Sequence, residues 1–370
     1  MYTLRKNLSN IPGWRTNRKI VVIESDDWGS VRTRSKKDYD EMLAKGLEVN
    51  RSNFTKYDAL ESNDDLEQLF DVLSKHKDST GRHPVLTPMC VVANPDFEKI
   101  KASGFQVYHY ENFVDTCNCY PNHNRVLDLW RKGIKDRLFV PALHGREHLS
   151  VSRWMKLLQE NNEGLRIAFD HESWGVSRYK GKEISEYLGA FHPDHASDIP
   201  DLVKIIESAG ELFKENCGYA PTHFIAPNRE SAKALDETFG KIGVKYLTMA
   251  KLRHYPLGDD KYKSEFLWLG KQNKELNQLY ITRNCGFEPS SSTIDWVNSC
   301  INEIVIAFKW RKPAVISSHR VNYIGSINPN NAKQGLNELN RLLSEIIKNW
   351  PEVEFMTSTE LGEIIALTKK

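Results

Sequence analysis

The chain has 370 residues, with 40% hydrophobic and 27% charged residues and a formal net charge of +2. This composition is ordinary for a soluble globular protein. The near-neutral net charge gives no general electrostatic attraction to nucleic acid or to an anionic membrane. The segment MYTLRKNLSN has no apolar signal core and no later segment approaches a membrane span, so we expect a cytoplasmic protein. The six irregularly spaced cysteines indicate neither a disulfide framework nor a cysteine zinc site. We expect the basic cluster Arg32–Lys37 to be solvated surface.

The first predicted strand contains Ile20–Ile23, an unbroken apolar run typical of a strand buried on both faces of a parallel sheet. Further strands are expected at 85–94, 105–110, 138–142, 222–227, 244–249, 278–283, 314–319 and 353–357. Helices are expected at 35–45, 63–76, 94–103, 122–133, 151–162, 198–216, 229–240, 293–309, 330–349 and 358–367.

Strand and helix alternate along almost the whole chain, which predicts an α/β fold with parallel strands. About seven or eight strand–helix units, with no G-x-G-x-x-G after the first strand, favour a TIM-like barrel over an open Rossmann sheet. We expect a single domain over residues 1–370. Residues 163–197 are predicted to be a long loop insertion over one face, because unstructured connections of this length are typical of lids or binding loops.

Polar side chains follow several of the predicted strands. They are Asp26, Asp27, His144, His148, Asn228, Arg229, Arg283, Asn284, His319 and Arg320. In a parallel barrel all of these strand ends face the same way, so carboxylates, imidazoles and amides are expected at one mouth.

The segment His144-Gly-Arg-Glu-His148 is the most informative of these. We interpret the i, i+4 pair of histidines as lying on one helical face, with both rings able to reach one ion. Two histidines and one carboxylate leave positions open for water and substrate, the catalytic pattern of Zn²⁺ and similar ions. Alone, the pair is also compatible with surface or core histidines, and Asp26-Asp27 with an acidic turn. Together with a third histidine at another strand end, they indicate a metal site.

The motifs resemble those of polysaccharide deacetylases, carbohydrate esterase family four. They are Asp26-Asp27 followed by Gly29, His144-x-x-x-His148, Ala226-Pro227-Asn228 and Ile316-Ser-Ser-His319, in the same order along the chain. The resemblance implies a distorted (β/α)7 barrel and metal-dependent removal of acetyl groups from N-acetylated or O-acetylated sugars or glycoconjugates.

Position by position, the resemblance assigns Asp27, His144 and His148 to a divalent metal ion, with Zn²⁺ the first candidate and other first-row ions as alternatives. Asp26 would be the general base for a metal-activated water, and His319 the general acid. The metal and a backbone N–H near Asn228 would hold the oxyanion.

The chain departs from the family pattern at the arginine that normally steadies the catalytic aspartate. Ile225 stands at that position, two residues before Pro227, so Asp26 lacks its expected partner. The candidates to replace this arginine are Arg229, Arg146 and Arg320.

Two other motifs also depart from the pattern. The second motif has Gly145 where serine or threonine is usual, and the aspartate-rich fourth motif is not evident. Arg283-Asn284 and Glu288 stand near its place. These differences indicate a divergent member of the family.

Candidate substrate contacts are Trp28, Trp174, Asn228, Arg229 and Arg320. The two tryptophans are equally interpreted as sugar-stacking platforms or as core residues. Four residues of the insertion are candidates to line the cleft, although histidines in such loops are commonly just solvated. They are His171, Glu172, His192 and His195.

Three alternatives to sugar deacetylation stay open. One is a hydrolase of the same superfamily acting on a non-sugar amide. Another is a non-catalytic carbohydrate-binding barrel, which the missing arginine suggests. A phosphate-handling enzyme that uses the two aspartates is the third, but no glycine-rich phosphate loop accompanies them.

Overall fold

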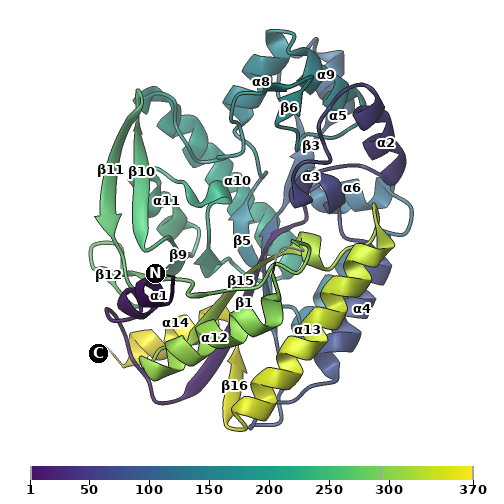
Figure 1. Ribbon diagram of the computed structural model, residues 1–370. Helices are drawn as coiled ribbons and strands as arrows, with labels where there is room; N and C mark the ends of the chain where they lie inside the picture. Colours follow the sequence, from purple (N-terminus) through teal and green to yellow (C-terminus); the bar gives the residue numbers. More distant parts are fainter. Residues whose placement is uncertain (1, 292–293, 369–370) are drawn as a thin grey trace.

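The computed structural model describes residues 2–291 and 294–368 (Figure 1). The strands are β1 (Lys19–Trp28), β2 (Leu86–Val91), β3 (Ala93–Pro95), β4 (Tyr110–Asn112), β5 (Ala142–Gly145), β6 (Arg178–Tyr179), β7 (Lys182–Glu183), β8 (His223–Phe224), β9 (Tyr246–Thr248), β10 (Leu252–Gly258), β11 (Lys261–Phe266), β12 (Gln272–Asn273), β13 (Gln278–Ile281), β14 (Cys285–Gly286), β15 (Ala314–His319) and β16 (Val353–Met356).

The helices are α1 (Tyr2–Ser9), α2 (Lys36–Ala44), α3 (Asn53–Tyr57), α4 (Asn63–Ser74), α5 (Phe97–Ala102), α6 (Phe113–Cys119), α7 (Val126–Lys135), α8 (Val151–Gln159), α9 (Glu163–Asp170), α10 (Ile199–Cys217), α11 (Asp236–Lys241), α12 (Trp296–Lys309), α13 (Pro329–Asn349) and α14 (Ser358–Leu367). Short 3-10 helices are η1 (Ala196–Asp198), η2 (Pro227–Arg229), η3 (Lys233–Leu235) and η4 (Arg320–Asn322).

The main sheet is curled and mostly parallel, which confirms the α/β prediction. Its strand order is β12-β13-β9-β8-β5-β2-β1-β15-β14, with β16 also paired to β1. Only the pair β12–β13 is antiparallel within this sheet, over the part of the chain that the structure describes. The end strands β12 and β14 are not paired with each other among these residues, so the closed count of seven units is not confirmed.

Strand β1 lies in the interior of the sheet because its apolar run fits a position that is covered on both faces. Ile20–Ile23 are at most 1% exposed. The strand pairs in parallel with β2 and β16 and with β15, and the register places Asp26 opposite His319. The two residues predicted as base and acid therefore leave the sheet at the same level.

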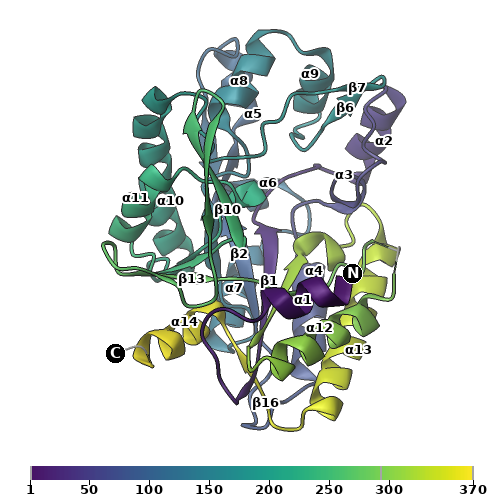
Figure 2. The ribbon, with the colours of Figure 1, turned by 60° about the vertical axis from the view of Figure 1, so that its left-hand side comes forward.

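Helices cover the flanks of the sheet. Helices α10 and α11 lie on one flank and α4, α12 and α13 on another (Figures 1 and 2). Helix α4 begins at Asn63, as predicted, and its N-cap Ser62 forms a capping box in which the side chains of Ser62 and Asp65 accept from each other's backbone amides. Helix α10 ends as predicted at Gly218, which takes the left-handed conformation.

The 163–197 insertion is more ordered than a long loop. It contains α9 and the small β6–β7 hairpin. Together with α2 and α8 it buries a second apolar cluster that includes Trp154, Phe169 and Trp174. Such an apolar cluster is not expected in an unstructured loop. It holds the insertion against the end of the sheet where β5 finishes.

Several element predictions are wrong. Of the expected strand 105–110, only Tyr110 belongs to a strand, and that strand pairs antiparallel with β3 outside the main sheet. Helices α3 and α6 and the β10–β11 hairpin were not predicted. The expected helix 229–240 is helical mainly over α11, and Thr293, the predicted start of another helix, lies outside the described residues.

None of the helices among the described residues is both long enough and apolar enough to cross a membrane.

Candidate functional site

The turn at the end of β1 presents Asp27 in an uncommon backbone conformation. Asp27 has a φ of 77°, and Gly29 has a φ of 81°. A Cβ at Gly29 would lie 2.2 Å from the carbonyl oxygen of Val91, so only glycine fits this close approach. A positive φ at a non-glycine residue costs energy and is typical of functional sites.

Asp27, His144 and His148 form a buried three-residue cluster. The Oδ1 atom of Asp27 lies 3.5 Å from Nε2 of His144 and 3.0 Å from Nε2 of His148. One ligand atom from each residue lies within 4.8 Å of the others. The expected helical pair is wrong, because His144 belongs to β5 and His148 lies in the loop before α8. Gly145, with a φ of 150°, stands between them where the chain leaves the strand.

The protonation of this cluster suits a cation. Nδ1–H of His144 donates to the carbonyl oxygen of Ile225 at 2.8 Å, and its buried Nε2 has no hydrogen-bond partner. Burial raises the pKa of Asp27, but His148, His144 and Arg32 outweigh it and hold that pKa well below its usual range. Burial lowers the pKa of His148 in spite of Asp27. An ionised Asp27 carboxylate and a neutral His148 imidazole match the protonation that metal ligands require.

Arg283 holds the second carboxylate, Asp26. Its Nη1 and Nη2 donate to the two oxygens of Asp26 at 2.7 and 2.5 Å, and its Nε donates to Glu24 at 2.5 Å. Burial raises the pKa of Asp26, but Arg283 outweighs it and the net shift is downward. Arg283 therefore occupies the role for which Arg229, Arg146 and Arg320 were the candidates, and those three candidates are wrong.

His319 lines the same cavity as the cluster and is held by Glu288. Nδ1 of His319 is 2.6 Å from Oε1 of Glu288, and Nε2 is 3.7 Å from Oδ2 of Asp26. Asn322 donates to the other oxygen of Glu288 at 2.7 Å. Burial lowers the pKa of His319, but Glu288, with Asp26 and Asp27, outweighs it and raises the pKa to about 9. His319 is therefore charged at neutral pH, as the acid role requires.

These groups line one cavity of about 340 Å³. Its lining consists of Asp26, Asp27, Arg32, Phe54, His144, His148, Leu188, Ala226, Asn228, Arg229 and His319. Asn228 and Arg229 are exposed and have positive φ angles of 54° and 58°. Seven of the ten residues predicted from the sequence as site residues thus meet at one place.

The other three predicted site residues do not line this cavity. Trp28 is fully buried, donates its Nε1–H to Ser25 and packs in the core against Phe139. Arg320 is also fully buried, between acidic residues. Trp174 stacks on the ring of His148 at 5.7 Å and so supports a candidate ligand from behind.

The four candidate cleft residues of the insertion also contact residues outside the cavity. His171 contacts Asp38, His192 contacts Glu230, His195 contacts Asp259 and Glu172 pairs with Arg34. None of the four is among the residues that line this cavity.

Sequence reasoning missed Arg32, which was expected on the surface. Arg32 is buried, with Nη2 3.4 Å from Oδ2 of Asp27 and Nε 3.1 Å from Asp58. It lies over the rings of Phe54 and Trp174. Its guanidinium thus contacts Oδ2 of Asp27, whereas the two histidines face Oδ1. Nothing in the pattern of the basic cluster distinguishes Arg32 from its exposed neighbours.

No protein-family model and no curated protein matches the chain. Solved structures do match. A putative polysaccharide deacetylase from Mycobacterium smegmatis is 11% identical, with 97% of this chain and 94% of that chain covered and a TM-score of 0.44. A probable polysaccharide deacetylase from Pseudomonas aeruginosa PAO1 is 9% identical, with 94% and 91% covered and a TM-score of 0.45. PuuE allantoinase is 11% identical, with 95% and 91% covered and a TM-score of 0.44.

The TM-scores of these three matches are all below 0.5. At this distance the activity has to be derived from the chemistry of the site.

Proposed function

We propose that the protein is a metal-dependent hydrolase that removes an acetyl group from an N-acetylated or O-acetylated sugar or glycoconjugate. The observation that carries the proposal is Asp26, which Arg283 holds between the Asp27–His144–His148 cluster and His319 in one cavity. Asp26 and His319 are two proton-transfer groups, each held by its own partner, and they lie beside three candidate metal ligands. This arrangement suits hydrolysis of an acyl bond.

The cluster fits a divalent cation. Its donors are two imidazole nitrogens and one carboxylate oxygen, a set typical of catalytic Zn²⁺ and other first-row ions. Nε2 of His144 is buried without a partner, which an ion would satisfy. When bound, such an ion supplies a water of lowered pKa and polarises the scissile carbonyl. Zn²⁺ is our first candidate.

The other residues move the protons. Asp26, ionised because Arg283 faces it, accepts a proton from the attacking water. His319 donates the proton on Nε2 to the departing amine or alkoxide. Its Nδ1 stays protonated because Nδ1–H donates a hydrogen bond to Glu288. A backbone N–H near Asn228 stabilises the oxyanion, and the exposed side chains of Asn228 and Arg229 contact the sugar at the rim.

The site does not support the three alternative functions equally. Hydrolysis of a non-sugar amide uses the same groups, so only the substrate separates it from deacetylation. The non-catalytic barrel was suggested by the missing arginine, and Arg283 removes that reason. The two aspartates are not arranged for phosphate, because one contacts two histidines and the other an arginine.

Acetate release from a panel of N-acetylated and O-acetylated sugars tests the proposal. We expect Asp26→Asn to lower turnover by about 10²–10⁴-fold, the usual worth of a general base, and to leave the metal content unchanged. Asp71→Asn, at an exposed position of α4, is the matched control and should keep full activity. Metal-loaded protein that releases acetate from none of these sugars but hydrolyses other amides would favour the amide alternative.

A further inference from the structure

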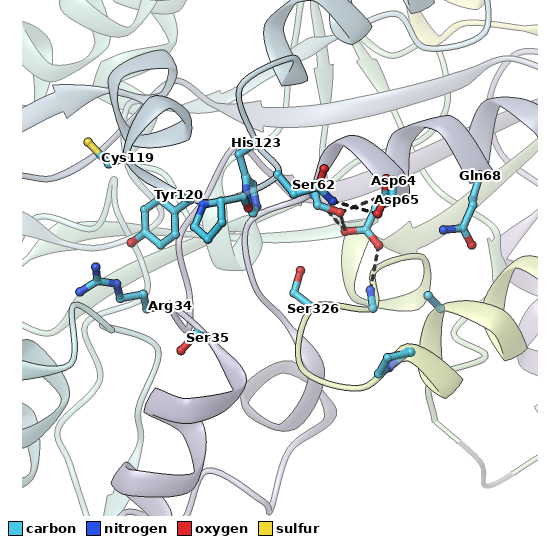
Figure 3. Close-up of a pocket in the computed structure, with 15 residues that line it drawn as sticks. Arg34, Ser35, Ser62, Asp64, Asp65, Gln68, Cys119, Tyr120, His123 and Ser326 are labelled. Atoms are coloured by element: carbon cyan, nitrogen blue, oxygen red, sulfur yellow. Dashed lines mark hydrogen bonds between the residues drawn. The ribbon is translucent and has the colours of Figure 1, made fainter.

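A second cavity of about 540 Å³ lies outside the catalytic cavity and shares no lining residue with it. The cavity is formed by the start of α2, the start of α4, the segment after α6 and the segment that leads into α13 (Figure 3). Its volume falls within the range of about 300–1,000 Å³ that is usual for small-molecule sites.

Three short segments connect the two cavities. Residues 27–34, 54–62 and 319–325 each begin at a residue that lines the catalytic cavity and end at one that lines the second cavity. A ligand in the second cavity would therefore contact loops that also build the catalytic site.

A buried ion-pair network within these three segments stiffens the region between the cavities. Arg320 is fully buried and contacts Asp58 at 3.0 Å and Glu61 at 2.8 Å. Arg32 contacts the same Asp58 at 3.1 Å. Because breaking a buried ion pair is strongly destabilising, this network holds the three segments in a fixed arrangement.

Asp65 and the basic groups of the second cavity already have partners. Asp65 accepts from the backbone amide of Ser62 at 2.9 Å and from its hydroxyl at 2.7 Å. Arg34 contacts Glu172 at 2.8 Å. Both ring nitrogens of His123 face backbone carbonyl oxygens, at 2.7 and 3.2 Å. The cavity thus offers no unpaired cation for an anionic ligand such as a phosphate.

Neutral hydrogen-bonding groups remain open at the same cavity. The Gln68 amide and the hydroxyls of Tyr120 and Ser326 make no hydrogen bond to other described residues. Asp64 accepts from Asn122 through Oδ2 at 2.9 Å, and its other oxygen stays available. The cavity also has apolar walls, formed by Pro121, Pro329 and Ala332.

This lining suits a ligand that carries several hydroxyl groups around a compact apolar body. A carboxylate oxygen, an amide and two hydroxyls supply both donors and acceptors, as a polyol requires. Few polar groups set among apolar walls are the usual composition of a specific small-molecule site. A neutral sugar residue has these properties.

We propose that the second cavity binds a neutral sugar residue of the glycan whose acetylated residue enters the catalytic cavity. The inference rests on the proposed function for the identity of that glycan. A chain that engages both cavities gains affinity over a single sugar, because the second contact is intramolecular.

Calorimetric titration with the N-acetylglucosamine hexamer tests this inference in an Asp26→Asn background that prevents turnover. Ser326→Trp fills the cavity from an exposed loop position, and Ser344→Trp, at an exposed position of α13, is the matched control. We expect Ser326→Trp to weaken binding at least tenfold and Ser344→Trp to leave it unchanged. Gln68→Ala, at an exposed position of α4, should weaken it by a smaller factor.

Equal affinity of the Ser326→Trp and parent proteins would overturn the inference, and so would failure of the parent to bind the hexamer. Acetate release from monomeric N-acetylglucosamine is measured in parallel in proteins that retain Asp26, and the Ser344→Trp control should not change it. Hexamer binding that depends on Ser326 without any acetate release leaves the second cavity standing and rejects the proposed function. Acetate release with hexamer binding independent of Ser326 does the reverse.

Discussion

The substitution Glu288→Gln separates the charge state of His319 from every other property of the site. Glu288 lies 2.6 Å from Nδ1 of His319 and is its largest favourable electrostatic partner. Glutamine keeps the size and a hydrogen-bonding oxygen but removes the negative charge. We therefore expect the pKa of His319 to fall from about 9 towards its ordinary value of about 6.5 or below.

The size of the effect depends on pH in a way that structural damage would not reproduce. With a pKa of about 9, about 90% of His319 is charged at pH 8, whereas with a pKa of about 6.5 only about 3% is charged. If turnover needs the charged form, Glu288→Gln loses about thirtyfold at pH 8 and less than twofold at pH 6. The same pair stabilises the fold fully below about pH 6.5, and this contribution is lost as the pH rises through about 9.

Two measurements check this prediction. The ring resonances of His319, followed by NMR in metal-free protein, should titrate near pH 9 in the parent and at least two pH units lower in Glu288→Gln. Acetate release by metal-loaded protein should show the pH-dependent loss, while the exposed Glu363→Gln should match the parent at both pH values. An equal loss at pH 6 and pH 8, or an unchanged His319 titration, would refute the reasoning.

Three further substitutions or treatments have defined outcomes. Arg283→Lys removes the planar fork of N–H groups that donates to both oxygens of Asp26, so acetate release should fall about 10–100-fold with an unchanged metal content. Full activity would contradict the assignment. Gly29→Ala should lower the free energy of unfolding in urea by about 2–4 kcal/mol, because its Cβ meets a backbone oxygen. Gly81→Ala, with a similar φ but open space, should cost about 1 kcal/mol; equal costs would contradict the steric argument. Chelation should abolish acetate release and added Zn²⁺ restore it, and activity that survives complete metal removal would exclude a metal role.

The convergence of the site was predictable because parallel strands end at one edge of a sheet. The runs before Asp26 and before His319 identify two such strands, and pairing in register brings their ends together. The same reasoning predicts that His144 and Asn228 lie near them, and both residues line the same cavity. Strand direction thus predicts which strand ends meet, although Trp28 and Arg320, which also lie at strand ends, are buried away from the cavity.

The partners of these residues were not predictable, because side-chain direction depends on local backbone turns. Asp26 and Trp28 are two apart and would share a face in a regular strand, but the positive φ of Asp27 and the bulge after Ser25 turn Trp28 into the core. Arg283 reaches Asp26 from the segment that follows β13. The motifs that contain Asp26 and Pro227-Asn228 therefore do not indicate that Arg283 is the partner of Asp26. The single-domain organisation and the cytoplasmic location stay predictions.

The metal content of the purified protein tests the central claim most directly. We predict about one equivalent of a divalent first-row ion per chain, and its loss in both His144→Ala and His148→Ala. His195→Ala, at an exposed histidine that contacts Asp259, should retain the ion and serves as the matched control. A folded parent protein that takes up no divalent ion after incubation with Zn²⁺, or one whose ion survives both substitutions, would contradict the account.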